Sequence, residues 1–182
     1  MADCMYCDPQ DARRLELMTP IAPLEASTLH FYREQSYPGR CVLVYHRHVH
    51  RLTELEPEEY AALFRDVRKA ADTLTRLYHP DKINYLILGD LCPHLHVHLV
   101  PKYQGGADWG TMFRMMPEPS HFLSPQEEAR QIENIRAALE RLVARHETLR
   151  TRLVAGPDGV PFQAVYPPAP FDLPVLDVPA DG

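Results

Sequence analysis

The chain has 182 residues, of which 45% are hydrophobic and 24% charged, values typical of one globular domain with a hydrophobic core. Its formal net charge of −6 argues against nucleic acid or an anionic membrane surface as a partner, so a phosphate-bearing ligand requires a local site. No apolar run approaches the roughly eighteen residues of a membrane-spanning helix.

The N-terminal segment MADCMYCDPQ has no basic region followed by an apolar stretch, so we predict no secretory signal and a cytoplasmic location. It contains a CxxC pair, Cys4 and Cys7. Without a secretory signal, such a pair indicates reduced thiols or a metal clip rather than a disulfide. A closed tetrahedral zinc site would need two further ligands.

Five segments have the composition of β-strands, with β-branched and aromatic residues between turn formers. They are residues 15–25, 27–34, 41–49, 82–90 and 94–101. Pro20 and Pro23 interrupt the first of them, so that strand is the least regular. The short GDLCP connection before the last strand favours an antiparallel hairpin.

Two helices are predicted from apolar residues that recur at steps of three and four. The first lies within residues 55–80, where Pro57 suits the first turn. The second begins at Ser124, with Glu127 three residues later in a capping-box pattern, and its apolar stripe continues to Leu153. This stripe fits a helix packed on its own domain and also a short heptad seam to a dimer partner.

The stretch PHLHVHLVPK, residues 93–102, places a histidine at every second position with apolar residues between them. Because alternate side chains of a strand share a face, His94, His96 and His98 would line one cleft while their neighbours enter the core. Two chemistries fit such a row. The imidazoles could ligate a catalytic metal. Alternatively, one could attack a phosphorus atom while a neighbour orients the phosphate or protonates the leaving group.

The pattern His-φ-His-φ-His-φ-φ, where φ is apolar, extends through Val100 and resembles the motif of the histidine triad family. The surrounding order is also similar: the segment PGRCVLVYHRHVHRLTELEPEEY, a long helix, the strand NYLILGD and then the triad. The resemblance covers roughly residues 4–103. It implies an α+β fold, with a five-stranded antiparallel sheet crossed by a helix, and a homodimer.

The resemblance also implies roles for particular residues. His96, the middle histidine, corresponds to the nucleophile that attacks the α-phosphorus, and His98 corresponds to the residue that contacts the phosphate and supports the transferring group. Asn84 and Asp90 lie where family members place polar residues near the nucleotide. A carboxylate at residue 90 would repel a phosphate unless it is protonated or turned away.

Zinc-bearing members of the family take two ligands from a CxxC pair, one from a histidine after the LVxP-type strand and one from the first triad histidine. The resemblance therefore implies a structural zinc held by Cys4, Cys7, His48 and His94, with His46 or His50 as alternatives to His48. Free thiols without a metal are the other interpretation. Two thiolates and two imidazoles leave no open coordination position, which weighs against a catalytic metal. No organic cofactor is expected.

The family includes nucleoside phosphoramidate hydrolases, dinucleoside polyphosphate hydrolases and nucleotidyl transferases or phosphorylases. His98 stands where the transferases commonly carry glutamine, so the resemblance favours hydrolysis, in which water resolves a nucleotidylated His96 and releases a nucleoside monophosphate. Asp90-Leu91 replaces the Gln-Ser pair of the phosphoramidate branch, which favours a dinucleoside polyphosphate substrate. A phosphoramidate hydrolase, a nucleotidyl transferase and a non-catalytic nucleotide-binding sensor are the alternatives.

These observations divide the chain into three parts. Residues 1–122 are predicted to form the histidine triad domain, residues 123–154 a helix packed on that domain or on a dimer partner, and residues 155–182 an extended tail. The tail contains seven prolines, a density that disfavours helices and central strands. Trp109 and Phe113, in the loop after the triad, either cover the cleft, stack on a base or simply pack.

Overall fold

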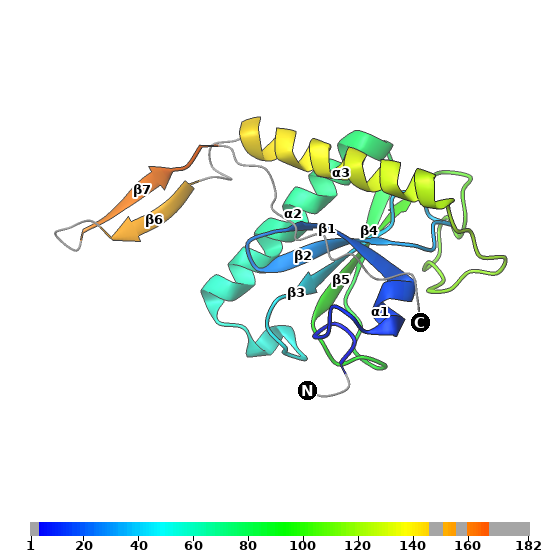
Figure 1. Cartoon of the computed structure of the whole chain (residues 1–182), viewed down its shortest axis with the longest axis horizontal. Coiled ribbons are helices and arrows are strands. Elements are labelled where there is room, and N and C mark those ends of the chain that lie inside the picture. The colour runs from blue at the N-terminus through cyan, green and yellow to red at the C-terminus, as the bar shows by residue number, and fades with distance from the viewer. Residues whose placement is uncertain (1–3, 146–150, 156–159, 168–182) are drawn as a thin grey trace.

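The computed structural model describes residues 4–145, 151–155 and 160–167 (Figure 1). It contains a five-stranded sheet in the order β1-β2-β3-β5-β4, in which every neighbouring pair is antiparallel. The strands are Met18–Pro23 (β1), Ser27–Tyr32 (β2), Cys41–Tyr45 (β3), Lys82–Leu86 (β4) and His96–Lys102 (β5). The predicted α+β class and five-stranded antiparallel sheet are confirmed.

The predicted strands are shortened at their ends. β1 begins at Met18 because the residues before it form a short helix, Ala12–Leu17 (α1), whose N-terminus is capped by the Asp11 side chain. The pairing of β1 with β2 shifts register between Pro20 and Ala22. An edge strand tolerates such prolines because no partner needs their missing amide hydrogens. The predicted hairpin of β4 and β5 is confirmed.

Helix α2 (Pro57–Tyr78) crosses one face of the sheet, as Figure 1 shows. A capping box formed by Glu56 and Glu59 begins it, after a 3-10 turn at Leu52–Glu54, and His79 ends it in the left-handed conformation at φ 49°. The helix contributes Leu63, Ala70 and Leu74 to the main core, and the strands contribute Leu29, Leu43 and Leu99. This core leaves the opposite face of the sheet available for polar chemistry.

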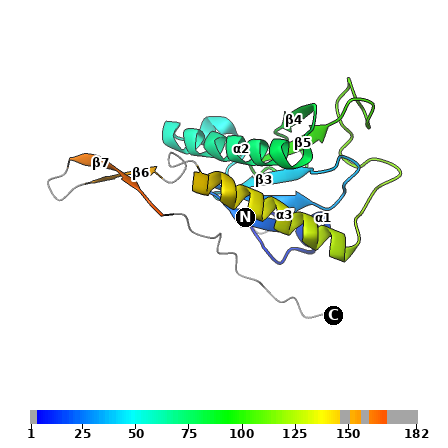
Figure 2. The same ribbon diagram turned by 90° about the horizontal axis from the view of Figure 1, so that it is seen from above.

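Helix α3 (Pro125–Arg145) lies beside α2, as Figure 2 shows. Ser124 caps it together with Glu127, as the sequence predicted: the Ser124 hydroxyl donates to the Glu127 carboxylate at 2.7 Å. Its apolar stripe enters the main core through Ile132, Ile135 and Leu139. The stripe therefore packs on its own domain over this length.

The expected helix over residues 123–154 is wrong in its last part. Residues 151–155 form a strand, Thr151–Ala155 (β6), which pairs with Pro161–Val165 (β7) within the expected extended tail. Pro161 occupies the first position of its strand, where proline is tolerated. The hairpin projects from the body (Figure 1). His146 and residues 168–182 lie outside the described part.

None of the described helices combines the length and the apolar composition that a membrane span requires.

Candidate active site

The two faces of the sheet differ in chemistry. Val42 of β3 pairs with His30 of β2 on one side and with His98 of β5 on the other, so these three side chains share a face. Leu95, Val97 and Leu99, which alternate with the histidines, belong to the core beneath α2. His96 and His98 therefore lie on the face opposite α2, as the alternation predicted.

His94 does not continue the strand that carries the other two histidines. β5 begins at His96, because the His94 amide donates to the Cys92 carbonyl oxygen in its own loop and the Leu95 amide donates to the Val49 carbonyl oxygen beyond the end of β3. The Nε2–H of His94 donates to the Tyr45 carbonyl oxygen at 2.8 Å, which leaves Nδ1 as the lone-pair nitrogen. This Nδ1 lies 3.4 Å from the Cys4 sulfur and 3.5 Å from the Cys7 sulfur.

Cys4, Cys7, His48 and His94 form one cluster, in which the four ligand atoms lie within 4.8 Å of one another. The Nδ1 of His48 is 3.3 Å from the Cys7 sulfur and 3.2 Å from the Nδ1 of His94. A tetrahedral zinc with bonds of about 2.3 Å to sulfur and 2.05 Å to nitrogen separates such ligands by roughly 3.3–3.8 Å. The donor set and its spacing therefore fit a closed zinc site.

Of the three candidate histidines after β3, His48 has a ring nitrogen in the cluster. The Nε2 of His46 lies 3.2 Å from the Thr28 hydroxyl, which turns this side chain away from the cysteines. The Nε2 of His50 lies 3.3 Å from the Nε2 of His48, the nitrogen that faces away from the cluster. His50 therefore contacts His48 on the side away from the cluster, where metal-bound imidazoles commonly have such a partner.

His96 has one ring nitrogen engaged and the other available. Its Nδ1–H donates to the His94 carbonyl oxygen at 2.6 Å, which fixes the tautomer and leaves the lone pair on Nε2. Burial lowers the pKa of His96, and the hydrogen bond to His94 opposes this shift. A neutral imidazole with an exposed lone pair is the nucleophilic form of histidine.

His98 lies beside His96, with the two ring centroids 5.1 Å apart. Burial, with added repulsion from His96 and Arg40, lowers the pKa of His98 to about 3, so its ring is neutral at pH 7. Its buried Nδ1 has no hydrogen-bond partner among the described residues. An unpaired buried nitrogen is costly, and a ligand that pairs with it would remove this cost.

Aromatic side chains cover the triad, and sequence analysis missed two of them. The Tyr6 ring lies 4.8 Å from that of His96, and the Tyr32 ring 5.9 Å from that of His98. Phe113 is buried, with its ring centroid 6.5 Å from that of His98. Trp109, in the same loop, is exposed. The signal for Tyr6 is its position between Cys4 and Cys7, because a metal that binds both cysteines would also fix the two residues between them.

A buried ion pair forms the wall beyond His98. Arg40 is fully buried, its guanidinium lies 3.3 Å from the Glu34 carboxylate, and it also donates to the Met115 carbonyl oxygen at 2.8 Å. The guanidinium carbon stands 3.8 Å above the Tyr32 ring. Arg40 thus joins the loop after β5 to the wall of the site.

Asn84 and Asp90 are placed differently. Asn84 pairs with Val100 in the sheet, two residues from His98, so its half-buried side chain lies on the triad face. Asp90 is exposed in the loop between β4 and β5, where its carboxylate accepts a long hydrogen bond from the Gly89 amide, 3.4 Å. The structure brings Asn84 to the triad face, whereas the Asp90 carboxylate makes no hydrogen bond to the described triad residues.

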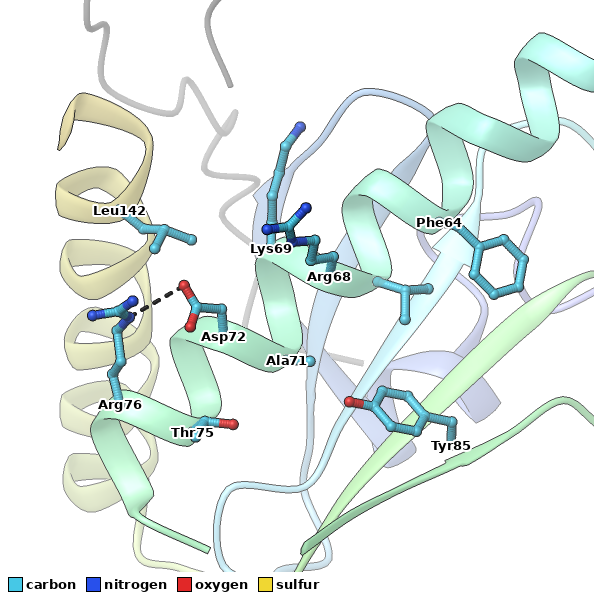
Figure 3. Close-up of a pocket in the computed structure, with 10 residues that line it drawn as sticks. Phe64, Arg68, Lys69, Ala71, Asp72, Thr75, Arg76, Tyr85 and Leu142 are labelled. Atoms are coloured by element: carbon cyan, nitrogen blue, oxygen red, sulfur yellow. Dashed lines mark hydrogen bonds and ion pairs between the residues drawn. The ribbon is translucent and has the colours of Figure 1, made fainter. Parts of the chain in front are cut away.

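An open pocket lies on the other side of the sheet, between α2, α3 and β4 (Figure 3). Phe64 and Tyr85 line one part of it, and Leu142 of α3 lies at its far edge, near the ion pair of Asp72 and Arg76 at 3.1 Å. Tyr85 pairs with Leu99, which faces the core, so this pocket opens on the face opposite the histidines. It is not part of the triad site.

Comparisons with known proteins agree with this geometry. Residues 25–105 match the HIT domain model. An asymmetrical bis(5'-nucleosyl)-tetraphosphatase from Schizosaccharomyces pombe is 33% identical over 70 residues, which cover 36% of this chain and 38% of that protein. The aligned part thus spans well under half of this relative.

Solved structures share the fold. A histidine triad protein from Bradyrhizobium japonicum has a TM-score of 0.65 and 24% identity, covering 70% of this chain and 95% of its own. A zinc-bound histidine triad family protein from Mycobacterium smegmatis has a TM-score of 0.57 and 22% identity, covering 80% and 99%. The triad motif on the sheet and the matching domain model together identify residues 25–105 as a HIT domain, and the fold is that of histidine triad proteins.

Proposed function

We propose that the protein is a nucleotidyl hydrolase that cleaves at the α-phosphate of a dinucleoside polyphosphate through a phosphoramidate on His96. The observation that carries this proposal is the hydrogen bond from the Nδ1–H of His96 to the His94 carbonyl oxygen, which leaves a neutral Nε2 lone pair beside His98. In this proposal residues 1–122 contain the catalytic domain.

The proposed reaction has two steps. The Nε2 of His96 attacks the α-phosphorus, an N–P bond forms, and the bond to the bridging oxygen breaks with its electron pair on the leaving nucleotide. Water then attacks the same phosphorus and loses a proton to solvent, the N–P bond breaks with its electron pair returning to Nε2, and a nucleoside monophosphate leaves. His98, as a neutral imidazole, donates one hydrogen bond to a phosphoryl oxygen, and Asn84 contacts the nucleotide.

The polyphosphate substrate is proposed because the matched relative from Schizosaccharomyces pombe is a tetraphosphatase. The exposed position of Asp90 removes a like-charge conflict with the phosphates but gives this residue no evident part in binding. We retain a nucleoside phosphoramidate hydrolase, a nucleotidyl transferase and a non-catalytic nucleotide sensor as the alternatives that the following experiment separates.

The test is turnover of diadenosine tetraphosphate, diadenosine triphosphate and adenosine phosphoramidate by the full chain, with nucleotide products separated by chromatography. We expect adenosine monophosphate from both dinucleotides at a kcat/KM at least about tenfold above that for the phosphoramidate. Preference for the phosphoramidate would assign the chain to that branch. Binding of adenosine monophosphate without turnover of any of the three would favour the sensor.

We propose that Cys4, Cys7, His48 and His94 hold a structural zinc. The ligand set is complete, so the metal would supply stability and not a Lewis-acid position for substrate. The N–H of His94 on Tyr45 and the contact of His50 with His48 orient the two imidazoles for binding. Reduced thiols are consistent with the cytoplasmic location that we propose.

We also propose a homodimer in which a second copy covers β4 and the adjoining side of α2. β4 is an edge strand of the sheet, and exposed edges of this kind invite pairing. Large apolar side chains on these two elements are exposed, namely Tyr60, Phe64 and Tyr85. A surface of contiguous apolar residues at a sheet edge is typical of a protein interface.

Replacing Tyr85 with aspartate is expected to convert this dimer to monomer, because the new carboxylate would be buried without a partner. Sedimentation velocity of the full chain measures the change. Phe162→Asp is the matched control, since Phe162 on β7 is 52% exposed and Tyr85 is 53% exposed. A wild-type monomer at all concentrations, or dissociation only in the Phe162→Asp variant, would refute this interface.

A further inference from the structure

A fifth candidate ligand stands just outside the proposed zinc cluster. The sulfur of Cys92 lies 3.9 Å from the sulfur of Cys4, yet Cys92 is not among the four residues whose ligand atoms group together. Its side chain is half-buried, whereas Cys41, the remaining thiol, lies wholly inside the core. The mechanism and the metal cluster use neither of these two cysteines.

The position of Cys92 follows from two segments that meet at the cluster. Its own loop leads into His94, whose amide donates to the Cys92 carbonyl oxygen at 2.8 Å. Against its side chain lies the N-terminal segment, whose Cys4 and Tyr6 form a buried apolar cluster onto which Cys92 packs. Because Cys4 and His94 both belong to the cluster, each segment is fixed and the two sulfurs stay close.

We propose that Cys4 and Cys92 form an oxidative modification site, at which a hydroperoxide joins the two sulfurs in a disulfide and withdraws Cys4 from the zinc cluster. The inference goes beyond the proposed hydrolase, and its effect on zinc rests on the proposed metal site. Cys92 is the resolving thiol in this scheme. Redox-sensitive cysteines often lie next to such a second cysteine.

The chemistry balances with the hydroperoxide as the oxidant. The Cys4 sulfur attacks the peroxide, the O–O bond breaks, and Cys4 becomes a sulfenic acid while one oxygen leaves as water or alcohol. The Cys92 sulfur then attacks the Cys4 sulfur, an S–S bond forms, and the hydroxyl leaves as water with the thiol proton. Two sulfurs lose one electron each, and the peroxide gains both.

Geometry favours Cys92 over Cys7 as the partner of Cys4. Cys7 lies against the two histidines, with its sulfur 3.3 Å from the Nδ1 of His48 and 3.5 Å from that of His94. The sulfur of Cys92 contacts Cys4 and is not required by the complete four-ligand set. The two sulfurs must close from 3.9 Å to the roughly 2.05 Å of a disulfide bond.

Disulfide formation would leave three ligands for the zinc. Since thiolates are the strongest ligands in such a site, loss of one thiolate lowers affinity for the metal and releases it. The N-terminal segment would stay attached to the triad loop through the new S–S bond. After oxidation, the Cys4–Cys92 disulfide would hold the segment that contains Tyr6 in place of the zinc cluster.

The experiment exposes the full-length protein to hydrogen peroxide after its zinc content has been measured. Zinc release is followed with a chromogenic chelator, and disulfides are mapped by mass spectrometry of peptides digested without reduction. The variant is Cys92→Ser, which keeps a small polar group at a half-exposed position, and the control is Cys41→Ala, which removes a thiol remote from the cluster. Catalytic activity is not needed for either readout.

We expect a Cys4–Cys92 peptide in the wild type and in Cys41→Ala, and zinc release about tenfold slower in Cys92→Ser. A dominant Cys4–Cys7 disulfide, or equal release from wild type and Cys92→Ser, would overturn the proposal. If the protein contains no zinc, the metal site is wrong, but peptide mapping still decides whether Cys4 and Cys92 pair. An inactive protein that forms the peptide would contradict the hydrolase alone.

Discussion

Replacement of His96 with alanine is expected to lower kcat/KM for diadenosine tetraphosphate by at least about 10⁴-fold, since loss of a catalytic nucleophile removes the covalent route. The imidazole is held by its hydrogen bond to the His94 carbonyl oxygen, and alanine supplies nothing in its place. The measurement is initial-rate release of adenosine monophosphate. A quench of the wild type in alkali should also trap one nucleotidyl group on the peptide that contains His96.

Two further variants make this prediction specific. His98→Ala is expected to lose roughly 10²–10³-fold, since it removes a hydrogen-bond donor and leaves the nucleophile in place. His121→Ala should retain wild-type activity, because this histidine is exposed in the loop before α3. Retention of more than a tenth of the activity by His96→Ala would assign the nucleophile to another group.

Chelation of zinc is expected to lower the melting temperature of the protein, because the proposed metal stabilises the fold and does not take part in the reaction. If zinc is present at about 1,000 times its dissociation constant, its binding stabilises the native state by about 4 kcal/mol. For a chain of this length, that free energy corresponds to a shift of roughly 8–16 °C. Thermal unfolding with and without a high-affinity chelator measures the shift, and added zinc should reverse it.

Variants separate a structural metal from a catalytic one. Cys7→Ser should reproduce the chelated protein, because it removes a ligand whose sulfur lies 3.3 Å from His48. Cys92→Ser should still bind one zinc per chain, since Cys92 is outside the four-ligand set. Loss of turnover on chelation at an unchanged melting temperature would contradict a structural role and favour a catalytic metal.

His94 links the proposed zinc site to the proposed nucleophile, His96. Its ring belongs to the metal cluster, while its carbonyl oxygen accepts the hydrogen bond that orients His96. Removal of the proposed zinc would therefore affect the proposed nucleophile, His96, through the backbone of His94. The Tyr6 ring, held between the two clip cysteines and 4.8 Å from the His96 ring, provides a second route for the same effect.

Local sequence patterns determined the elements of the fold and part of the site. Apolar residues three and four positions apart predicted α2 and the beginning of α3, and the alternation in β5 placed His96 and His98 opposite the core. These predictions succeeded because each periodicity reports which side of one element is buried, and a few consecutive residues contain that information.

Tertiary structure decided the rest, since it depends on residues far apart in the chain. His46, His48 and His50 are equivalent in local pattern, and only contacts with the distant Cys7 and His94 distinguish His48. The apolar stripe predicted for α3 extended to Leu153, but residues 151–155 form a strand that pairs with β7. The burial of Tyr6 over His96 and the contact of Cys4 with Cys92 likewise arise only when the N-terminal segment folds across the triad face.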